Sequence, residues 1–293
     1  MNQYILEARE IDYCYPDGTE ALKGLTMKIV EGQKIAVLGA NGAGKSTLFL
    51  HFNGIMRPQR GKIIFMGKEL NYRHRSLLEL RQNVGIVFQD PDGQLFSASV
   101  LQDVSFGPLN LGLTPEEALA RSKQAMLETE IEDLGKKPTH FLSYGQKKRV
   151  SIAGVLSMNP KVIIFDEPTA CLDPQMTRKI MDLLYRLNEQ GKTLILSTHD
   201  VDLAYSWADY IFLLKQGTIA GEGTPREIFA NRELLRQCGL TSPWVMEVYR
   251  ELVNGELLPE NVPVPQNKEE LFRLIRGAAA SRTHFRPKIA GHR

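Results

Sequence analysis

The chain has 293 residues, of which 43% are apolar and 24% charged, and this is ordinary for a soluble globular protein with one large domain or two small ones. A formal net charge of +2 gives no basic footprint for nucleic acid, and three cysteines far apart in sequence predict reduced thiols rather than a disulfide frame. The first residues show no secretory leader and no apolar run reaches the ~20 residues of a membrane span, so we expect any membrane contact to run through a partner.

Residues 4–35 are predicted to form antiparallel strands around a turn. The turn signal is Pro16-Asp17-Gly18, and apolar residues alternate with polar ones in the stretch that follows it. Tyr15 stands just before the turn and could stack on a nucleotide base, a contact that needs no base-specific hydrogen bond. An aromatic residue at such a position is more often part of a core, so the residues alone leave both roles open.

A glycine-rich loop follows the short apolar run of residues 34–38. It reads Gly39-Ala40-Asn41-Gly42-Ala43-Gly44-Lys45-Ser46 and then Thr47, which fits the phosphate-binding pattern of Gly, four residues and Gly-Lys-Ser. Residues 46–53 are predicted as a helix that Gly54 ends, so the loop has the strand and helix that this pattern requires. Loop N–H groups can cradle phosphates, Lys45 can reach the β- and γ-phosphates, and the Ser46 hydroxyl can ligate Mg²⁺. We therefore predict a nucleotide site.

The middle of the chain changes from strand to helix. Residues 84–88 are predicted as a strand that ends at Gln89, and residues 90–160 are rich in helical pattern. Thr114 is placed to cap one helix and Ser143 to cap another. The N-terminal N–H groups of the second helix would then be available to an anion.

Two uninterrupted apolar runs, residues 161–165 and 192–198, predict strands buried on both faces of a parallel sheet. The helix between them ends at Gly191 and completes a βαβ unit. One face of this helix is apolar and carries Met176, Ile180, Leu183, Leu184 and Leu187.

Polar residues follow four of the predicted strands, namely Gly39, Gln89, Asp166 and His199. Open α/β sheets bind ligands at the carboxyl edge of their strands, so we expect these residues to converge on one site. Asp166 would hold Mg²⁺ through its water shell, and Glu167 would orient and deprotonate a water that attacks the γ-phosphate. Gln89 and His199 could each contact the γ-phosphate, its metal or the attacking water.

Together these motifs resemble the nucleotide-binding subunit of ATP-binding cassette (ABC) transporters. Leu142-Ser143-Tyr144-Gly145-Gln146 resembles the family signature, with Tyr144 where Gly is usual. Tyr15 matches the adenine-stacking aromatic, Gln89 the Q-loop, residues 170–173 the D-loop and His199 the switch histidine.

The resemblance implies a fold: an α/β P-loop NTPase of the ABC ATPase type, with a mixed or parallel core sheet, an N-terminal antiparallel β subdomain, an inserted helical subdomain and a small helical C-terminal extension. It also implies hydrolysis of ATP with Mg²⁺, and a head-to-tail dimer in which Ser143, Gly145 and Gln146 of one subunit complete the site built on the other. The residues implied to bind nucleotide within one chain are Tyr15, Gly39, Ala40, Asn41, Gly42, Ala43, Gly44, Lys45, Ser46 and Thr47. The implied catalytic residues are Glu167, His199 and Gln89, and the implied metal ligands are Ser46, Gln89 and, through water, Asp166.

Longer strings narrow the resemblance. Residues 15–22, 88–96 and 106–113 resemble energy-coupling-factor importers, and residues 198–205 look most like their cobalt-import ATPases, although Gly93 and Cys171 depart from the usual residues there. This implies a peripheral protein on the cytoplasmic face of the cell membrane, which energises cobalt uptake through a transmembrane coupling subunit and substrate-binding membrane subunits. Nickel or vitamin uptake stays open, as does a homodimer against a pair of close paralogues.

The loop and helix after Gln89 carry more apolar residues than a solvated linker needs. We expect this segment to be the docking surface for the membrane subunit, with packing inside the helical subdomain as the alternative. The apolar residues concerned are Leu95, Phe96, Val100, Phe106 and Leu109.

Domain boundaries follow from where the motifs end. Residues 1–229 are expected to form the ABC ATPase domain, with the helical subdomain at about 90–160. Residues 230–276 contain helical patches and predict a C-terminal extension that assists dimerisation. Residues 277–293 are small and basic and predict a disordered tail, solvated rather than bound to anionic lipid.

Two other classes of function compete with the importer ATPase. A soluble ABC ATPase acting on DNA or ribosomes generally carries a duplicated cassette or a long coiled-coil insertion, and this chain has neither. A nucleotide sensor without hydrolysis is disfavoured because Lys45, Asp166, Glu167 and His199 are all present.

Overall fold

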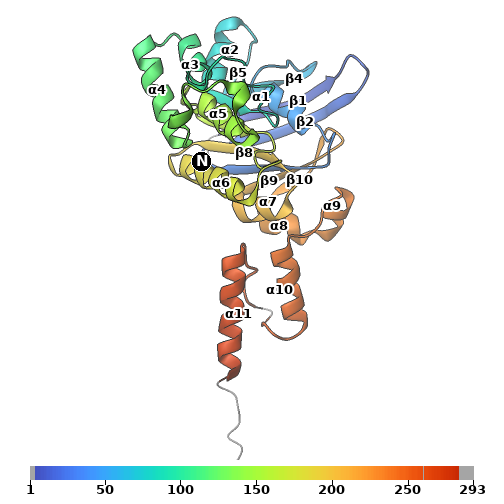
Figure 1. Ribbon diagram of the computed structural model, residues 1–293. Helices are drawn as coiled ribbons and strands as arrows, with labels where there is room; N and C mark the ends of the chain where they lie inside the picture. Colours follow the sequence, from blue (N-terminus) through green and yellow to red (C-terminus); the bar gives the residue numbers. More distant parts are fainter. Residues whose placement is uncertain (1–3, 260, 284–293) are drawn as a thin grey trace, which may run out of the picture.

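The computed structural model describes residues 4–259 and 261–283 and is built on two sheets (Figure 1). One is antiparallel, in the strand order β2-β1-β4-β5, and starts with the hairpin that the sequence predicts around residue 17. Its strands are β1 (Tyr4–Cys14), β2 (Glu20–Val30), β4 (Arg60–Phe65) and β5 (Lys68–Glu69).

The other sheet has six strands in the order β10-β9-β3-β8-β7-β6. Its strands are β3 (Lys34–Leu38), β6 (Val84–Val87), β7 (Val162–Phe165), β8 (Thr193–Thr198), β9 (Tyr210–Lys215) and β10 (Thr218–Gly223). All neighbours are parallel except β9 and β10, which form an antiparallel hairpin at one edge. The fold is therefore the mixed α/β fold expected from the sequence.

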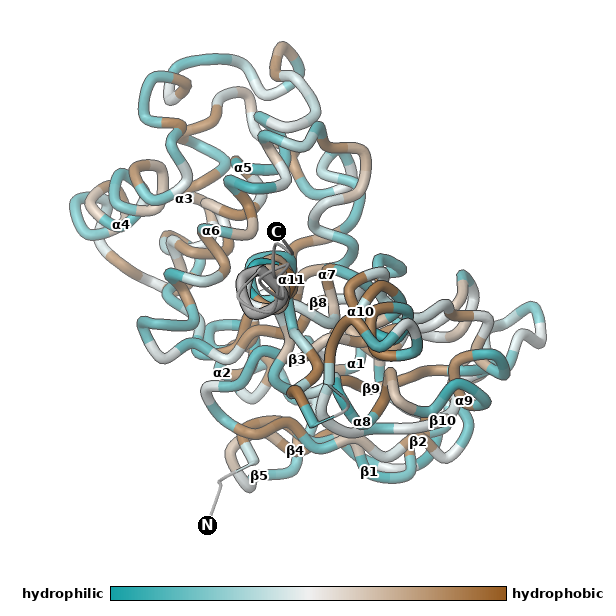
Figure 2. Tube along the Cα trace, turned by 90° about the horizontal axis from the view of Figure 1, so that it is seen from below, coloured by the Kyte–Doolittle hydropathy of each residue, from teal (hydrophilic) through white to brown (hydrophobic). Residues whose placement is uncertain are grey.

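The parallel sheet is buried on both faces, which explains its uninterrupted apolar strands. Alternate residues of each strand enter different cores: in β3, Ala36 and Leu38 pack with the helices, whereas Ile35 and Val37 pack towards the antiparallel sheet. Figure 2 shows the same division, with β1, β2, β4 and β5 on one side of the central strands and α3, α4, α5 and α6 on the other.

The helices of the ATPase core are short, except α6. They are α1 (Lys45–Phe52), α2 (His74–Asn83), α6 (Pro174–Glu189), α7 (Val201–Trp207) and α8 (Pro225–Ala230). The next helix, α9 (Arg232–Gln237), lies beyond the expected domain end at residue 229, but its Leu235 packs into the same core as α6, α7 and α8. The apolar face of α6 is buried from Ile180 to Leu187, as its periodicity predicts, while Met176 at the start of the helix is half-buried. Asp173 caps α6 through bonds from the N–H groups of Gln175 and Met176.

A helical subdomain lies between β6 and β7 in the sequence. It consists of α3 (Val100–Asn110), α4 (Pro115–Glu128) and α5 (Tyr144–Leu156), with short 3₁₀ turns at Glu132–Leu134 and Thr139–Phe141. Thr114 caps α4 and Ser143 caps α5, each in a capping box with the residue three positions on. Both caps are those that the sequence predicts.

The C-terminal helices α10 (Trp244–Asn254) and α11 (Lys268–Thr283) project away from the ATPase core (Figure 1). They share a small apolar cluster of their own, which includes Tyr249 and Leu271. The Tyr205 hydroxyl of α7 donates to the Pro265 carbonyl at 3.1 Å, and the Trp244 N–H donates to Asp202 at 2.8 Å. Arg250 donates to the Phe229 carbonyl at 3.2 Å and Gln266 to the Tyr205 carbonyl at 3.5 Å, so these hydrogen bonds join the extension to the core.

The predicted start of a disordered tail at residue 277 is wrong, because α11 continues to Thr283. The run after Gly277 is rich in alanine, the strongest helix former, and it only has to extend a helix that is already nucleated. The rest of the expected tail, residues 284–293, lies outside the described residues. Within residues 4–259 and 261–283, no helix combines the length and apolar character needed to cross a bilayer.

Candidate nucleotide-binding site

The glycine loop joins β3 to α1 at the carboxyl edge of the parallel sheet. Gly44 has φ +105°, and a Cβ there would lie 2.5 Å from the Ala21 carbonyl oxygen, so no other residue fits without a shift of the backbone. The Lys45 side chain folds back over the loop, and its Nζ donates to the carbonyl oxygens of Gly39 at 2.6 Å and Ala40 at 3.2 Å. These two hydrogen bonds to loop carbonyls thus hold the Lys45 ammonium group in position.

A cavity of about 230 Å³ opens above this loop and gathers most of the predicted site residues. It is lined by Tyr15, Thr19, Ala21, Asn41, Gly42, Ala43, Gly44, Lys45, Ser46, Thr47, Gln89, Asp166 and Glu167. Gly39 and Ala40 lie beneath it as the acceptors for Lys45, and His199 adjoins it through a bond to Glu167. Segments 150 residues apart in sequence therefore meet at this edge of the sheet, as expected for the ends of parallel strands.

The two carboxylates after β7 are nearly buried, at 6% and 7% exposure for Asp166 and Glu167. The Ser197 hydroxyl of β8 donates to Asp166 at 2.5 Å, and the same Oγ accepts the Glu167 N–H at 2.9 Å. Glu167 has φ +45°, a conformation that costs a non-glycine residue free energy. Its Oε2 lies 3.1 Å from Nδ1 of His199, whose side chain is 74% exposed. Glu167 is thus held between a buried strand and an exposed histidine.

Burial and charge act in opposite directions on Lys45. Burial of the ammonium lowers its pKa, and the negative charges of Glu167 and Asp166 raise it again. The site therefore holds one cation and two anions around one small cavity, and Lys45 is the positive charge beside which a phosphate group could bind.

Gln89 is held through its backbone by α5 of the helical subdomain. The Tyr144 hydroxyl donates to the Gln89 carbonyl at 3.1 Å, and the Lys148 Nζ donates to the carbonyls of Phe88 and Gln89 at 2.8 and 2.9 Å. Lys148 is fully buried, and burial lowers its pKa to about 8 although Asp166 opposes the shift. The Gln89 side chain itself is exposed. Gln89 therefore lines the nucleotide cavity and is also hydrogen-bonded to the helical subdomain.

The predicted trans residues Ser143, Gly145 and Gln146 are not among those that line the cavity of their own chain. Ser143 is exposed at the start of α5, where its Oγ accepts the Gln146 N–H at 3.3 Å and Gln146 Oε1 accepts the Ser143 N–H at 3.0 Å. Gly145 lies against α6, where a Cβ would meet Met176 at 3.4 Å. That these three residues complete the site of another subunit stays a prediction.

Sequence reasoning missed three residues that hold the site together: Ser197, Tyr144 and Lys148. Ser197 carries a signal, because it is a polar residue near the end of a buried strand that ends at the same sheet edge. Lys148 carries no such signal, since a lysine in a helix with several basic residues is usually solvated. Tyr144 departs from the family signature, but nothing in the sequence indicates its bond to the Gln89 carbonyl.

The donor set suits magnesium. Ser46, Gln89 and Asp166 line one cavity and offer a hydroxyl, an amide oxygen and a carboxylate, the hard oxygen ligands that Mg²⁺ takes together with water and phosphate. No cluster of three or more His, Cys, Asp or Glu side chains with metal-site geometry occurs in the described part of the chain.

A family model described as ABC transporter matches residues 22–170. Among curated proteins, the chain is 50% identical over 261 residues to the energy-coupling factor transporter ATP-binding protein EcfA of Methanocaldococcus jannaschii, a match that covers 89% of this chain and 92% of the relative. The protein of the same name from Methanococcus maripaludis is 52% identical over 252 residues, with 86% and 90% covered.

Solved structures agree with the sequence matches. The structure of cbiO1 from Clostridium perfringens, described as part of the ABC transporter complex cbiONQ, has a TM-score of 0.71 and 49% identity, and the match covers 85% of this chain and 99% of that one. A dimeric ATP-binding cassette in a post-hydrolysis state, bound to ADP and phosphate, has a TM-score of 0.70 and 29% identity, with 75% and 99% covered.

Proposed function

Because this chain belongs to the ABC transporter family, as an ATP-binding and ATP-hydrolysing subunit of the energy-coupling-factor type, we propose that it energises the uptake of cobalt ions through membrane partner subunits. The observation that carries the catalytic part is the single cavity that brings the glycine loop together with Asp166 and Glu167. The cobalt assignment rests on the resemblance of residues 198–205 and on the similarity to cbiO1.

In the proposed site, Tyr15 stacks on the adenine, the loop N–H groups bind the phosphates, and Lys45 contacts the β- and γ-phosphates. Ser46, Gln89 and, through water, Asp166 would hold Mg²⁺. The bound ion would neutralise negative charge on the two terminal phosphates. Support comes from the shared lining of these residues around one cavity.

Hydrolysis in this proposal uses Glu167 as the general base. A water oxygen attacks the γ-phosphorus, the bond to the β–γ bridging oxygen breaks so that ADP leaves, and the water proton passes to the Glu167 carboxylate. His199 keeps that carboxylate turned towards the cavity, and this is supported by the 3.1 Å contact between Nδ1 and Oε2. Gln89 reports the state of the γ-phosphate to the helical subdomain, to which its carbonyl is bonded.

A second ATPase subunit, either another copy or a close paralogue, completes each site. Its Ser143, Gly145 and Gln146 would face the γ-phosphate bound on Lys45 of the first subunit. In favour of this, Ser143 is exposed at a capped helix N-terminus and lies outside the cavity of its own chain, and a 29% identical cassette is dimeric with ADP and phosphate bound.

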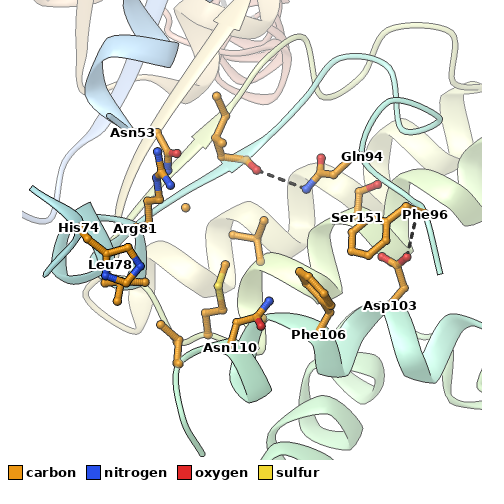
Figure 3. Close-up of a pocket in the computed structure, with 17 residues that line it drawn as sticks. Asn53, His74, Leu78, Arg81, Gln94, Phe96, Asp103, Phe106, Asn110 and Ser151 are labelled. Carbon is orange, nitrogen blue, oxygen red and sulfur yellow. Dashed lines mark hydrogen bonds between the residues drawn. The ribbon is translucent and has the colours of Figure 1, made fainter. Parts of the chain in front are cut away.

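The membrane subunit docks, in this proposal, into a cavity of about 600 Å³ between α2, α3 and α5 (Figure 3). Figure 3 shows Phe106 pointing into it, with Phe96 beside it and Arg81 on the opposite side. The Phe96 and Phe106 rings meet edge to face at 4.7 Å, yet the two residues are 65% and 48% exposed. Exposed aromatics at a cavity rim favour docking over internal packing.

Two of the residues expected on this surface do not belong to it. Val100 is fully buried and Leu95 is partly buried against the same core, because both face the interior from the start of α3 and the loop before it. Leu109 is 46% exposed but does not line this cavity; it lines a neighbouring cavity that also contains Phe106. Docking here would make the protein peripheral at the cytoplasmic face of the cell membrane.

The solute is tested by uptake of radioactive cobalt in cells that carry the complete transporter. The Lys45→Ala variant should abolish cobalt accumulation, because it removes the cation that contacts the phosphates. Lys68→Ala, at an exposed lysine on β5, is the matched control and should leave uptake unchanged. If Lys45→Ala spares cobalt but abolishes uptake of nickel or a vitamin, the cobalt assignment is wrong and the ATPase role remains.

A further inference from the structure

Four side chains beside the nucleotide cavity form a closed group, which we call the Tyr13–His51 cluster. Tyr13 lies at the end of β1 and Tyr15 just beyond it, two positions apart and therefore on the same side of the strand. Thr47 and His51 lie four positions apart on α1 and share one face of that helix. The end of β1 and α1, the helix that follows the phosphate loop, thus contact each other through these two pairs of residues.

The contacts within the cluster form a complete circuit. The Tyr15 hydroxyl lies 3.0 Å from Thr47 Oγ1, and Nδ1–H of His51 donates to the Thr47 carbonyl at 2.7 Å. The Tyr13 ring meets the Tyr15 ring edge to face at 5.1 Å and 89°, and the His51 ring at 4.8 Å and 73°. Each ring is therefore held by two neighbours.

The backbone next to Tyr15 is fixed as well. Gln59 accepts the Cys14 N–H and donates to the Cys14 carbonyl, both at 2.9 Å. The Tyr15 N–H donates to the Thr19 carbonyl at 2.9 Å across the hairpin turn. The ring of Tyr15 thus has little freedom to move relative to the phosphate loop.

Packing alone does not explain a histidine at position 51. The side chain is fully buried, and its Nε2 has no hydrogen-bond partner among the described residues, which costs stability compared with an apolar side chain of similar size. Burial lowers the His51 pKa, so the ring stays neutral, with its Nδ1 proton on the Thr47 carbonyl. The residue therefore supplies one directed bond and one ring face for Tyr13.

We infer that Tyr13 and His51 are positioning residues that hold the Tyr15 ring at a set angle and height over the phosphate loop, so that a purine ring can stack on it while its phosphates occupy the loop. This rests on the proposed stacking role of Tyr15. A ring fixed before the nucleotide arrives loses less conformational freedom on binding, so affinity for the base rises without any new contact to it.

The test is the dissociation constant for ATP, measured by calorimetry on the full-length protein. Tyr13→Leu should weaken ATP binding about three- to tenfold, since it removes both edge-to-face contacts. Tyr13→Phe keeps the ring and should restore the parental affinity. His51→Leu should weaken binding in the same direction. In steady state, Tyr13→Leu should raise KM for ATP and change kcat less than twofold.

A double-mutant cycle separates this inference from the stacking proposal on which it rests. In a Tyr15→Ala background, Tyr13→Leu should have no further effect, because there is no ring left to position. If Tyr15→Ala itself leaves ATP affinity unchanged, the stacking proposal fails. If Tyr15→Ala weakens binding but Tyr13→Leu does not, or acts equally in both backgrounds, the positioning inference fails.

A matched control tests whether the role of Tyr13 is purely structural. Ile11→Ala cuts a fully buried side chain from the same strand, outside the cluster, and should lower the melting temperature without changing ATP affinity. If Tyr13→Leu behaves like Ile11→Ala in both measurements, Tyr13 only packs the core.

Discussion

Glu167, the proposed general base, stands out at the scale of single residues by its burial and its backbone. It combines a nearly buried carboxylate with a left-handed backbone of φ +45°, a conformation that surrounding structure must impose at a cost of roughly 1–3 kcal/mol. The Glu167 backbone is held in this conformation by the hydrogen bond from its N–H to Ser197 Oγ. The Ser197 hydroxyl also donates to Asp166. One serine therefore sets the positions of both carboxylates.

Replacement of Glu167 by Gln should reduce ATP turnover at least about 100-fold, because the amide cannot accept the proton of the attacking water. The side chain keeps its size, and its Oε1 can still meet His199, so ATP should remain bound. Turnover is measured under saturating ATP, and binding by calorimetry. A variant that hydrolyses ATP within tenfold of the parent rate would contradict the assignment of the base.

At the scale of elements, the segment from Gln89 to α3 links two sites. Its first residue is bonded to Tyr144 and Lys148 of α5, and its later part places Phe96 and Phe106 on the rim of the large cavity. Lys147 of α5 also pairs with Asp92 at 2.5 Å. A shift of α5 on nucleotide binding would therefore be passed to the docking surface through these side-chain bonds to Phe88, Gln89 and Asp92.

We expect Phe96→Glu to uncouple ATP hydrolysis from transport. A charge on the cavity rim should prevent the membrane subunit from docking, while the free protein keeps its ATP affinity because Phe96 lies outside the nucleotide cavity. Leu127→Glu is the control, since Leu127 is 55% exposed on α4 and does not line the docking cavity. Equal losses of ATP affinity and melting temperature in the free Phe96→Glu protein would favour internal packing instead.

At the scale of the whole molecule, a single chain carries all the predicted site residues but does not bring all of them to one cavity. The N-terminus of α5 carries Ser143 outside the cavity built on Lys45, and we propose that a second subunit supplies this residue. The extension formed by α10 and α11 leaves Trp244, Phe272 and Ile275 more than a third exposed, which fits the expected help in dimerisation.

Mixing two inactive variants tests the composite site. Ser143→Arg and Lys45→Ala should each be inactive alone, yet equal amounts should recover about a quarter of the parental rate, because random pairing gives mixed dimers with one intact site. Thr114→Arg removes an equivalent capping box on α4, away from the site, and should keep its activity. A mixture with no recovery, or a monomer fully active at every dilution, would contradict the composite site.

The sequence by itself determined the parts of this protein that depend on local pattern. The glycine loop, the buried strands, the caps at Thr114 and Ser143, and the polar residues at the strand ends all follow from spacing, since parallel strands must end at one edge. That edge rule was enough to bring Gln89, Asp166 and Glu167 to the cavity above Lys45.

Only the tertiary structure decided which side chains orient these residues. Ser197 between the two carboxylates, Lys148 on the Gln89 carbonyl and His51 against Tyr13 are contacts between segments about 30 to 60 residues apart. No local period encodes such pairs, because they depend on how strands order within the sheet and on how each helix turns when it packs. For the same reason the sequence placed Val100 on the surface, whereas packing of α3 buries it.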